Sequence, residues 1–105
     1  MSRRVRALGP APGEGEHRAF RVDGRYLLVA RRAGRLLALD DWCNHAGCLL
    51  SDGRVEADRV VCPCHGAVFR LGDGALLSEP KLCEAQATYD VVEHDGTVYW
   101  VREEE

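Results

Sequence analysis

The chain has 105 residues, a net charge of −3 at pH 7, 46% hydrophobic residues and 30% charged residues. This length fits one small domain, whose core leaves a thin margin of stability unless a metal or a disulfide adds to it. The acidic balance argues against nucleic acid as a partner, and no apolar run reaches the roughly 18 residues of a membrane span.

The two ends of the chain carry opposite charges. Arginines cluster within residues 3–6, and glutamates occupy residues 103–105. We expect both runs to lie on frayed, solvated termini. The arginines are followed by Gly-Pro-Ala-Pro-Gly at 9–13, which is not the apolar region of a signal peptide. These features predict a cytoplasmic protein.

The first predicted elements follow a polar opening segment. Residues 1–16 are rich in glycine and proline, which does not suit a core element. Strand-like runs then occupy 19–22, 26–30 and 36–39, separated by Asp23-Gly24 and Ala33-Gly34. Asp-Gly between two such runs indicates a hairpin, because glycine tolerates the positive φ of a tight turn. The three runs predict an antiparallel meander.

The second half of the chain also reads as short strands. Strand pieces are expected at 60–61 and 68–69, and a hairpin joins 89–93 to 97–101 through Asp95-Gly96. Helical spacing is poor, with 81–87 the one weak candidate. A tryptophan in such a protein usually packs in the β-core, and we expect this of Trp42. The fold class predicted is all-β.

Two short stretches each carry a cysteine followed closely by a histidine. The first holds Cys43 and His45, the second Cys62 and His65, and a glycine follows each. Thiolate and neutral imidazole both bind iron or zinc, but the order differs from that of a zinc finger, in which two cysteines precede two histidines. Five cysteines in a cytoplasmic chain suggest metal or redox chemistry before a disulfide framework.

This pattern, Cys-x-His with Gly-Cys behind it and then Cys-x-Cys-His-Gly, resembles the Rieske iron–sulfur family. There, two cysteines hold one iron of a 2Fe–2S cluster and two histidines hold the other. The resemblance implies that Cys43 and Cys62 bind the first iron, and His45 and His65 the second. It implies one domain over 1–105, an antiparallel β-sandwich base at about 17–40 and 73–102 with an inserted cluster-binding subdomain at about 41–72.

Further residues take roles from the same resemblance. Rieske proteins that carry cysteines at the positions of Cys48 and Cys64 tie the two loops by a disulfide, with two reduced, buried thiols as the alternative. A proline-containing third loop covers the cluster in the family, and Pro80 is the candidate here. Partners are then expected over the loop tips, near Asn44, Ala46, Gly66 and residues 78–80.

Two positions depart from the high-potential members of the family. Those members carry a serine after the second Cys-His-Gly and a tyrosine two residues later, whose hydroxyls donate hydrogen bonds to cluster sulfurs. Ala67 and Phe69 occupy these positions here, and neither side chain can donate. The resemblance therefore implies a reduction potential in the lower half of the Rieske range of about −150 to +300 mV.

The implied function is that of a Rieske-type ferredoxin, not itself an enzyme, which carries single electrons from a flavin-dependent reductase to an oxygenase or similar redox enzyme. The length leaves no room for a catalytic mononuclear iron domain. Two alternatives stay open: a small subunit of a nitrite reductase-type complex, and a zinc-stabilised interaction module. Outside the two loops, Cys83, His17 and His94 are expected to be ordinary core or surface residues.

Overall fold

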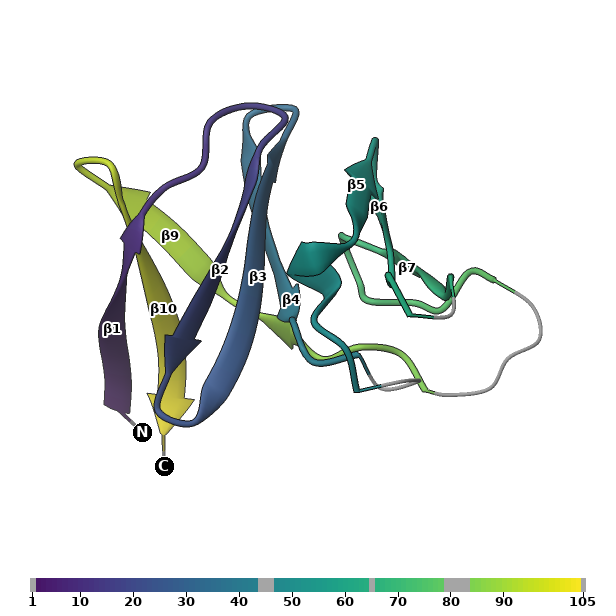
Figure 1. The fold of residues 1–105 in the computed structure, drawn as a ribbon. Coiled ribbons are helices and arrows are strands. Elements are labelled where there is room, and N and C mark those ends of the chain that lie inside the picture. The colour runs from purple at the N-terminus through teal and green to yellow at the C-terminus, as the bar shows by residue number, and fades with distance from the viewer. Residues whose placement is uncertain (1, 44–46, 65, 79–83, 105) are drawn as a thin grey trace.

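The computed structural model describes residues 2–43, 47–64, 66–78 and 84–104. Within these ranges Figure 1 shows strands and one short 3-10 helix, η1 (Leu50–Asp52). The strands are β1 (Ser2–Pro10), β2 (His17–Val22), β3 (Arg25–Arg32), β4 (Arg35–Asp40), β5 (Arg54–Glu56), β6 (Arg59–Val61), β7 (Val68–Arg70), β8 (Thr88–Tyr89), β9 (Val91–His94) and β10 (Thr97–Glu104). The all-β prediction is confirmed.

Helices contribute little to the part of the chain that the structure describes. The weak helical candidate is wrong over 84–87, which are irregular, and its residues 81–83 lie outside the described ranges. Among the described residues there is also no helix with the length and apolar character needed to cross a membrane.

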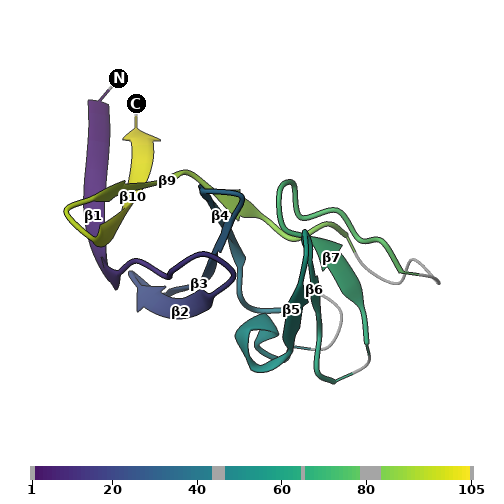
Figure 2. The same cartoon turned by 90° about the horizontal axis from the view of Figure 1, so that it is seen from above.

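Three antiparallel sheets lie side by side, as Figures 1 and 2 show. The central sheet has the strand order β2-β3-β4-β8, the flanking sheet β1-β10-β9 lies on one side of it, and the small sheet β5-β6-β7 lies on the other. The predicted meander is confirmed as β2, β3 and β4. The predicted short strands around the second loop are confirmed as β6 and β7.

The burial pattern of strand β3 explains why the other two sheets pack on opposite faces of the central sheet. Its run Leu27 to Ala30 is fully buried, and successive side chains of a strand point to opposite faces. Leu28 and Ala30 join a core cluster with residues of β6 and β7, whereas Leu27 packs with Trp100 of β10. The continuous apolar run therefore gives the central sheet two covered faces.

The hairpin turns follow from the sequence at a few positions. Asp23 and Gly24 have φ values of 51° and 75°, and Asp95 and Gly96 have 51° and 80°. In each case the flanking residues pair directly, Val22 with Arg25 and His94 with Thr97. Positive φ at both central residues is the geometry of a type I′ turn, which matches the twist of the strands it joins.

The expectation of frayed termini is wrong for the described residues, whereas that of solvation is confirmed for Arg4 and Arg6, which are exposed. Strand β1 pairs with β10 along its length, from Ser2 opposite Glu104 to Pro10 opposite Thr97. Leu8 of β1 packs against the core clusters that contain Trp100 and Val98. The polar start of the chain is ordered because a distant strand supplies its hydrogen-bond partners, and local composition does not reveal such a partner.

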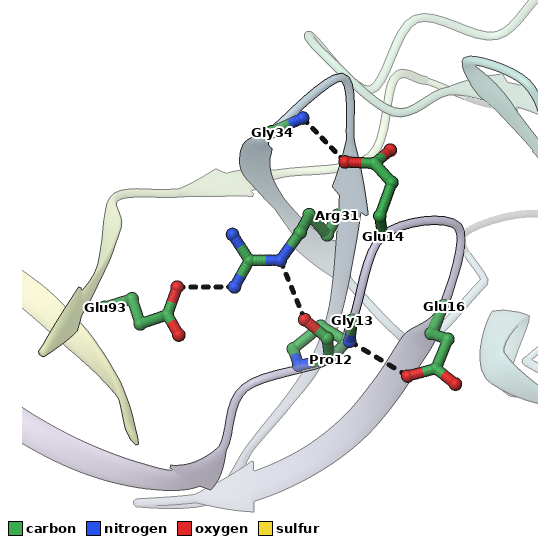
Figure 3. A network of polar contacts seen from close by, with 7 residues as sticks. All are labelled: Pro12, Gly13, Glu14, Glu16, Arg31, Gly34 and Glu93. Carbon is green, nitrogen blue, oxygen red and sulfur yellow. Dashed lines mark hydrogen bonds and ion pairs between the residues drawn. The ribbon is translucent and has the colours of Figure 1, made fainter. Parts of the chain in front are cut away.

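A polar network ties the loop between β1 and β2 to the central sheet, as Figure 3 shows. The Nε of Arg31 donates to the Pro12 carbonyl at 2.9 Å, and its Nη2 forms an ion pair with Glu93 of β9. The carboxylate of Glu14 accepts hydrogen bonds from the backbone N–H groups of Ala33 and Gly34, at 2.8 and 2.7 Å. Glu14 thus fastens the β3–β4 turn to the preceding loop.

Glu14 is expected to make stability depend on acid pH. The hydrogen bond from the Gly34 N–H, with that from Ala33 and the nearby charge of Arg31, lowers the pKa of Glu14 below its ordinary value of 4.5. A carboxyl with a lowered pKa stabilises the folded chain above that ordinary value, and the contribution is lost as pH falls through the lowered value. The melting temperature of Glu14→Gln should therefore change less than that of the wild type between about pH 5 and pH 3. Identical pH profiles would contradict this assignment.

Candidate metal centre

Cys43 and Cys62 begin two loops that leave the ends of strands. Cys43 follows β4 after a short connection, and Cys62 directly follows β6. Both side chains are thiols outside any disulfide, and each is 1% exposed. They belong to one buried cluster, together with Leu50 of η1 and Phe69 of β7. Two buried thiols in one cluster, one from each loop, are suited to thiolate ligation of a metal.

The two loops have equivalent backbone hydrogen bonds. In the first, the Cys43 N–H donates to the Cys48 carbonyl at 2.8 Å, and the Gly47 N–H donates back to the Cys43 carbonyl at 2.9 Å. In the second, the Cys62 N–H donates to the Ala67 carbonyl at 2.8 Å, and the Gly66 N–H to the Cys62 carbonyl at 3.1 Å. Cysteine and glycine are four residues apart in both.

The glycines are needed for this loop shape. Gly47 has a φ of 70° and Gly66 a φ of 74°, a region that residues with a Cβ rarely adopt. Both loops close with the same bonds and the same glycine conformation. The backbone around the cysteine that begins each loop therefore has the same hydrogen-bonded conformation in both. The structure thus places Cys43 and Cys62 as a matched pair, one from each loop.

The two loops are joined covalently. Cys48 and Cys64 form a disulfide with a Cα–Cα distance of 6.4 Å. This confirms the predicted bridge and excludes the alternative of two reduced thiols in the structure. Each cysteine lies close in sequence to a buried thiol, so the bridge holds the two loops beside one another at the candidate centre.

A buried carboxylate fixes the exit of the first loop. Asp41 is 1% exposed and accepts hydrogen bonds from the Ser51 N–H at 2.7 Å and the Ser51 hydroxyl at 2.6 Å. Burial raises the pKa of Asp41 above its ordinary value of 3.8, while the two bonds from Ser51 act in the opposite direction. His17 of β2 donates from Nε2 to the Ser51 carbonyl at 3.2 Å, which links the base to η1.

Three predictions about neighbouring residues have clear outcomes. Ala67 and Phe69 are buried beside the two cysteines, at 8% and 0% exposure, and offer no side-chain donor there. Trp42 is 50% exposed and packs edge-to-face on Tyr26, with ring centroids 5.8 Å apart. The expectation that Trp42 lies in the β-core is therefore wrong: its indole lies against Tyr26 and beside Gly47 of the first loop.

Several predicted residues lie outside the described ranges. These are the candidate ligands His45 and His65, the candidate third-loop residue Pro80, and the tip residues Asn44, Ala46 and Glu79, as well as Cys83. Among the described residues, no group of three or more histidine, cysteine or acidic side chains is arranged to hold a metal ion. His94 lies at the far turn of the β9–β10 hairpin, beside Asp95, away from both loops.

The chain matches the Rieske [2Fe-2S] domain family over residues 5–102. It belongs to this family. Sulredoxin from Sulfurisphaera tokodaii is 39% identical over 87 residues, which are 76% of this chain and 80% of that protein. The cytochrome b6-f complex iron-sulfur subunit from Chlorobaculum tepidum is 32% identical over 94 residues, and this match spans 88% of the chain but only 50% of that subunit.

A solved structure extends the comparison. The oxygenase–ferredoxin complex of carbazole 1,9a-dioxygenase contains a chain with a TM-score of 0.81 and 28% identity to this one, which covers 96% of this chain and 95% of that one. Membership of the Rieske family confirms three predictions: the fold, the 2Fe–2S cofactor and a role in electron transfer. The buried thiol pair fits this cofactor, because one iron of a Rieske cluster takes two cysteine ligands.

The sequence did not reveal two residues that shape the centre. Asp41 and Gln86 are the buried polar or charged side chains among the described residues, at 1% and 2% exposure. Asp41 stands in an Asp-Asp pair directly before the first loop, a weak signal that the second aspartate is turned inward. Gln86 lies between two alanines, and nothing in that pattern indicates a buried amide.

Proposed function

We propose that this Rieske protein is a ferredoxin that receives single electrons from a flavin-dependent reductase and delivers them to an oxygenase. The supporting observation is the likeness over nearly the whole chain to the ferredoxin-sized partner in the carbazole 1,9a-dioxygenase complex. That likeness covers 96% of this chain and 95% of that one, so it concerns nearly the whole of both chains. When bound, the cluster accepts and returns one electron.

We propose Cys43 and Cys62 as ligands of one iron, and His45 and His65 as ligands of the other. The proposed cysteine ligands are supported by the burial of both thiols in one cluster and by the equivalent hydrogen bonds of the two loops. The proposed histidine ligands are supported by the sequence, in which one histidine stands between each cysteine and the glycine that closes its loop. Neutral imidazoles in place of two thiolates leave the oxidised centre with less negative charge, which raises its potential above that of four-cysteine clusters.

Partners are proposed to approach over the loop tips. In this family the outer nitrogens of the ligand histidines face solvent, which makes that side the shorter path for an electron. Gly66 in the second loop is exposed, whereas Cys43 and Cys62 are buried in a cluster with Phe69 and Leu50. Exposure on one side and apolar cover on the other favour a single docking side.

Reconstitution with purified partners tests this role. The protein should show the visible absorption of an iron–sulfur cluster, take up one electron per chain from NADH through a flavin-dependent reductase, and reoxidise when a substrate-loaded Rieske-type oxygenase is added. A stably reduced protein that no oxygenase reoxidises would reject the assignment to an oxygenase system. A colourless protein that contains zinc would reject the electron-carrier role altogether.

Ala67→Ser is expected to raise the reduction potential. Ala67 is buried beside both cysteines, so a hydroxyl there can donate to a cluster sulfur, which stabilises the reduced form. A hydrogen bond of about 1–2 kcal/mol corresponds to roughly 40–90 mV for a one-electron couple, and protein-film voltammetry measures this shift.

Val68→Thr is the matched control for this substitution. It adds a hydroxyl at the next residue, the first of β7, whose half-buried side chain points to the face opposite that of buried Phe69, so the potential should stay within about 20 mV of the wild type. Equal shifts in the two variants would contradict the proposed place of Ala67 beside the cluster sulfurs.

A further inference from the structure

Gln86 lies two residues before β8, where the chain rejoins the central sheet. Its side chain is 2% exposed, and its Nε2 donates to the Asp40 carbonyl at 2.7 Å and to the Trp42 carbonyl at 2.8 Å. A side-chain amide nitrogen carries two hydrogens, so these two bonds use its whole donor capacity. Both acceptors belong to the segment that leads from β4 into the first cysteine loop.

The backbone of Gln86 forms a hydrogen bond to a second segment, the turn after β7. The Gln86 N–H donates to the Gly74 carbonyl at 2.8 Å, and the adjacent Ala87 carbonyl accepts from the Asp40 N–H at 2.8 Å. A Cβ on Gly74 would stand 2.1 Å from the Gln86 carbonyl oxygen. The two backbone segments are therefore in contact and leave no room for a side chain at residue 74. Gln86 therefore joins the entrance of the first loop to the turn after β7.

The segment between Ser78 and Gln86 is tied to the chain beside each cysteine loop. At its start, the Ser78 hydroxyl accepts from the Val68 N–H at 3.1 Å, directly after the second loop. At its end, Gln86 binds the Trp42 carbonyl, directly before the first loop. Ser78 and Gln86 thus each contact the backbone next to one of the two loops that the disulfide joins.

We infer that Gln86 is a positioning residue for Cys43. The Trp42 carbonyl that Gln86 binds and the Cys43 N–H that bonds to Cys48 belong to one peptide unit, which is planar. Fixing one end of this unit fixes the direction of the other and the position of the Cys43 Cα, from which the Cys43 side chain extends. This inference rests on the proposed role of Cys43 as an iron ligand.

Gln86→Met tests the inference in the holoprotein. Methionine has a similar length and no donor, so it leaves two buried carbonyls without these bonds and frees the loop entrance. We expect cluster loss in excess chelator to be at least fivefold faster at a temperature where circular dichroism shows the chain folded. The electron paramagnetic resonance (EPR) spectrum of the reduced cluster should also broaden or shift its g values, because the Cys43 ligand geometry is less uniform.

Arg31→Met is the matched control. It too removes a donor to a backbone carbonyl, that of Pro12, together with the ion pair to Glu93, but on β3 and away from both loops. It should lower the melting temperature and leave the EPR spectrum and the rate of cluster loss unchanged. If Gln86→Met does not fold, Gln86→Asn, which keeps both donors on a shorter side chain, is expected to give the same spectral change in weaker form.

The outcomes separate this inference from the function on which it rests. If the wild type lacks a Rieske-type EPR spectrum, the proposed ligand set fails. If the wild type has that spectrum and the folded Gln86 variants match it in both spectrum and cluster lifetime, the positioning role of Gln86 is overturned while the proposed function stands.

Discussion

Cys62→Ala is expected to abolish retention of the cluster. Cys62 is 1% exposed, lies in the same buried cluster as Cys43, and starts a loop that closes through Gly66 and Ala67. Alanine removes the thiolate without disturbing these backbone bonds, so one iron would lose one of its two proposed cysteine ligands. The purified variant should contain less than about a tenth of the wild-type iron and lack its visible absorption.

The chain supplies its own control for this experiment. Cys83 is a further cysteine that the sequence sets outside both loops, and Cys83→Ala should keep the wild-type iron content and spectrum. Cluster retention by Cys62→Ala, or equal losses in both variants, would contradict the proposed cysteine ligands. Cys43→Ala should behave as Cys62→Ala does, since the two loops hold their cysteines by equivalent bonds.

Removal of the disulfide is expected to produce the second large effect. The bridge between Cys48 and Cys64 spans 16 residues of sequence, and closing a loop of this length contributes about 3 kcal/mol in the chain-entropy treatment. The double variant with alanine at both positions should lose this amount of unfolding free energy in urea and release its cluster at lower urea concentration. Its four proposed iron ligands are intact, so it should still assemble a cluster.

Reduction of the wild type provides an independent check on the disulfide. Wild-type protein treated with a strong dithiol reductant should approach the stability of the double variant, whereas the double variant should not respond to the reductant. Equal stability of the wild type and the double variant, before any reduction, would contradict a bridge between the two loops.

The parts of the fold that depend on local chemistry could be predicted from the sequence. The Asp23-Gly24 and Asp95-Gly96 turns are determined by two adjacent residues that accept positive φ, and both form hairpins at the expected places. The cysteine loops are likewise local, because each closes through a glycine four residues after its cysteine. Short-range signals of this kind determine the local backbone conformation independently of the rest of the chain.

The parts that depend on distant partners could not be predicted. Strand β1 has a polar sequence with a proline at its end, and it is a strand because β10 pairs with it from the other end of the chain. The same holds for Gln86, whose acceptors Asp40 and Trp42 lie more than forty residues earlier in the sequence. An isolated glutamine between two alanines gives no sign of such a partner.

Trp42 shows a third kind of limit. A tryptophan next to a buried cysteine suggests burial by its hydrophobicity, yet its indole is half exposed and packs on Tyr26. Its carbonyl accepts from Gln86, and its chain direction is set by the loop that begins at Cys43. Backbone requirements at this junction override the side-chain preference.

Pulsed EPR of the reduced protein determines whether one iron is held by two cysteines and its neighbour by two histidines, as we propose. Protein labelled with ¹⁵N only in histidine should show a spectrum of low average g with couplings to two histidine nitrogens, and the nitrogen signals should change with the label. A spectrum without histidine nitrogen couplings, typical of a cluster with four cysteine ligands, would contradict the account.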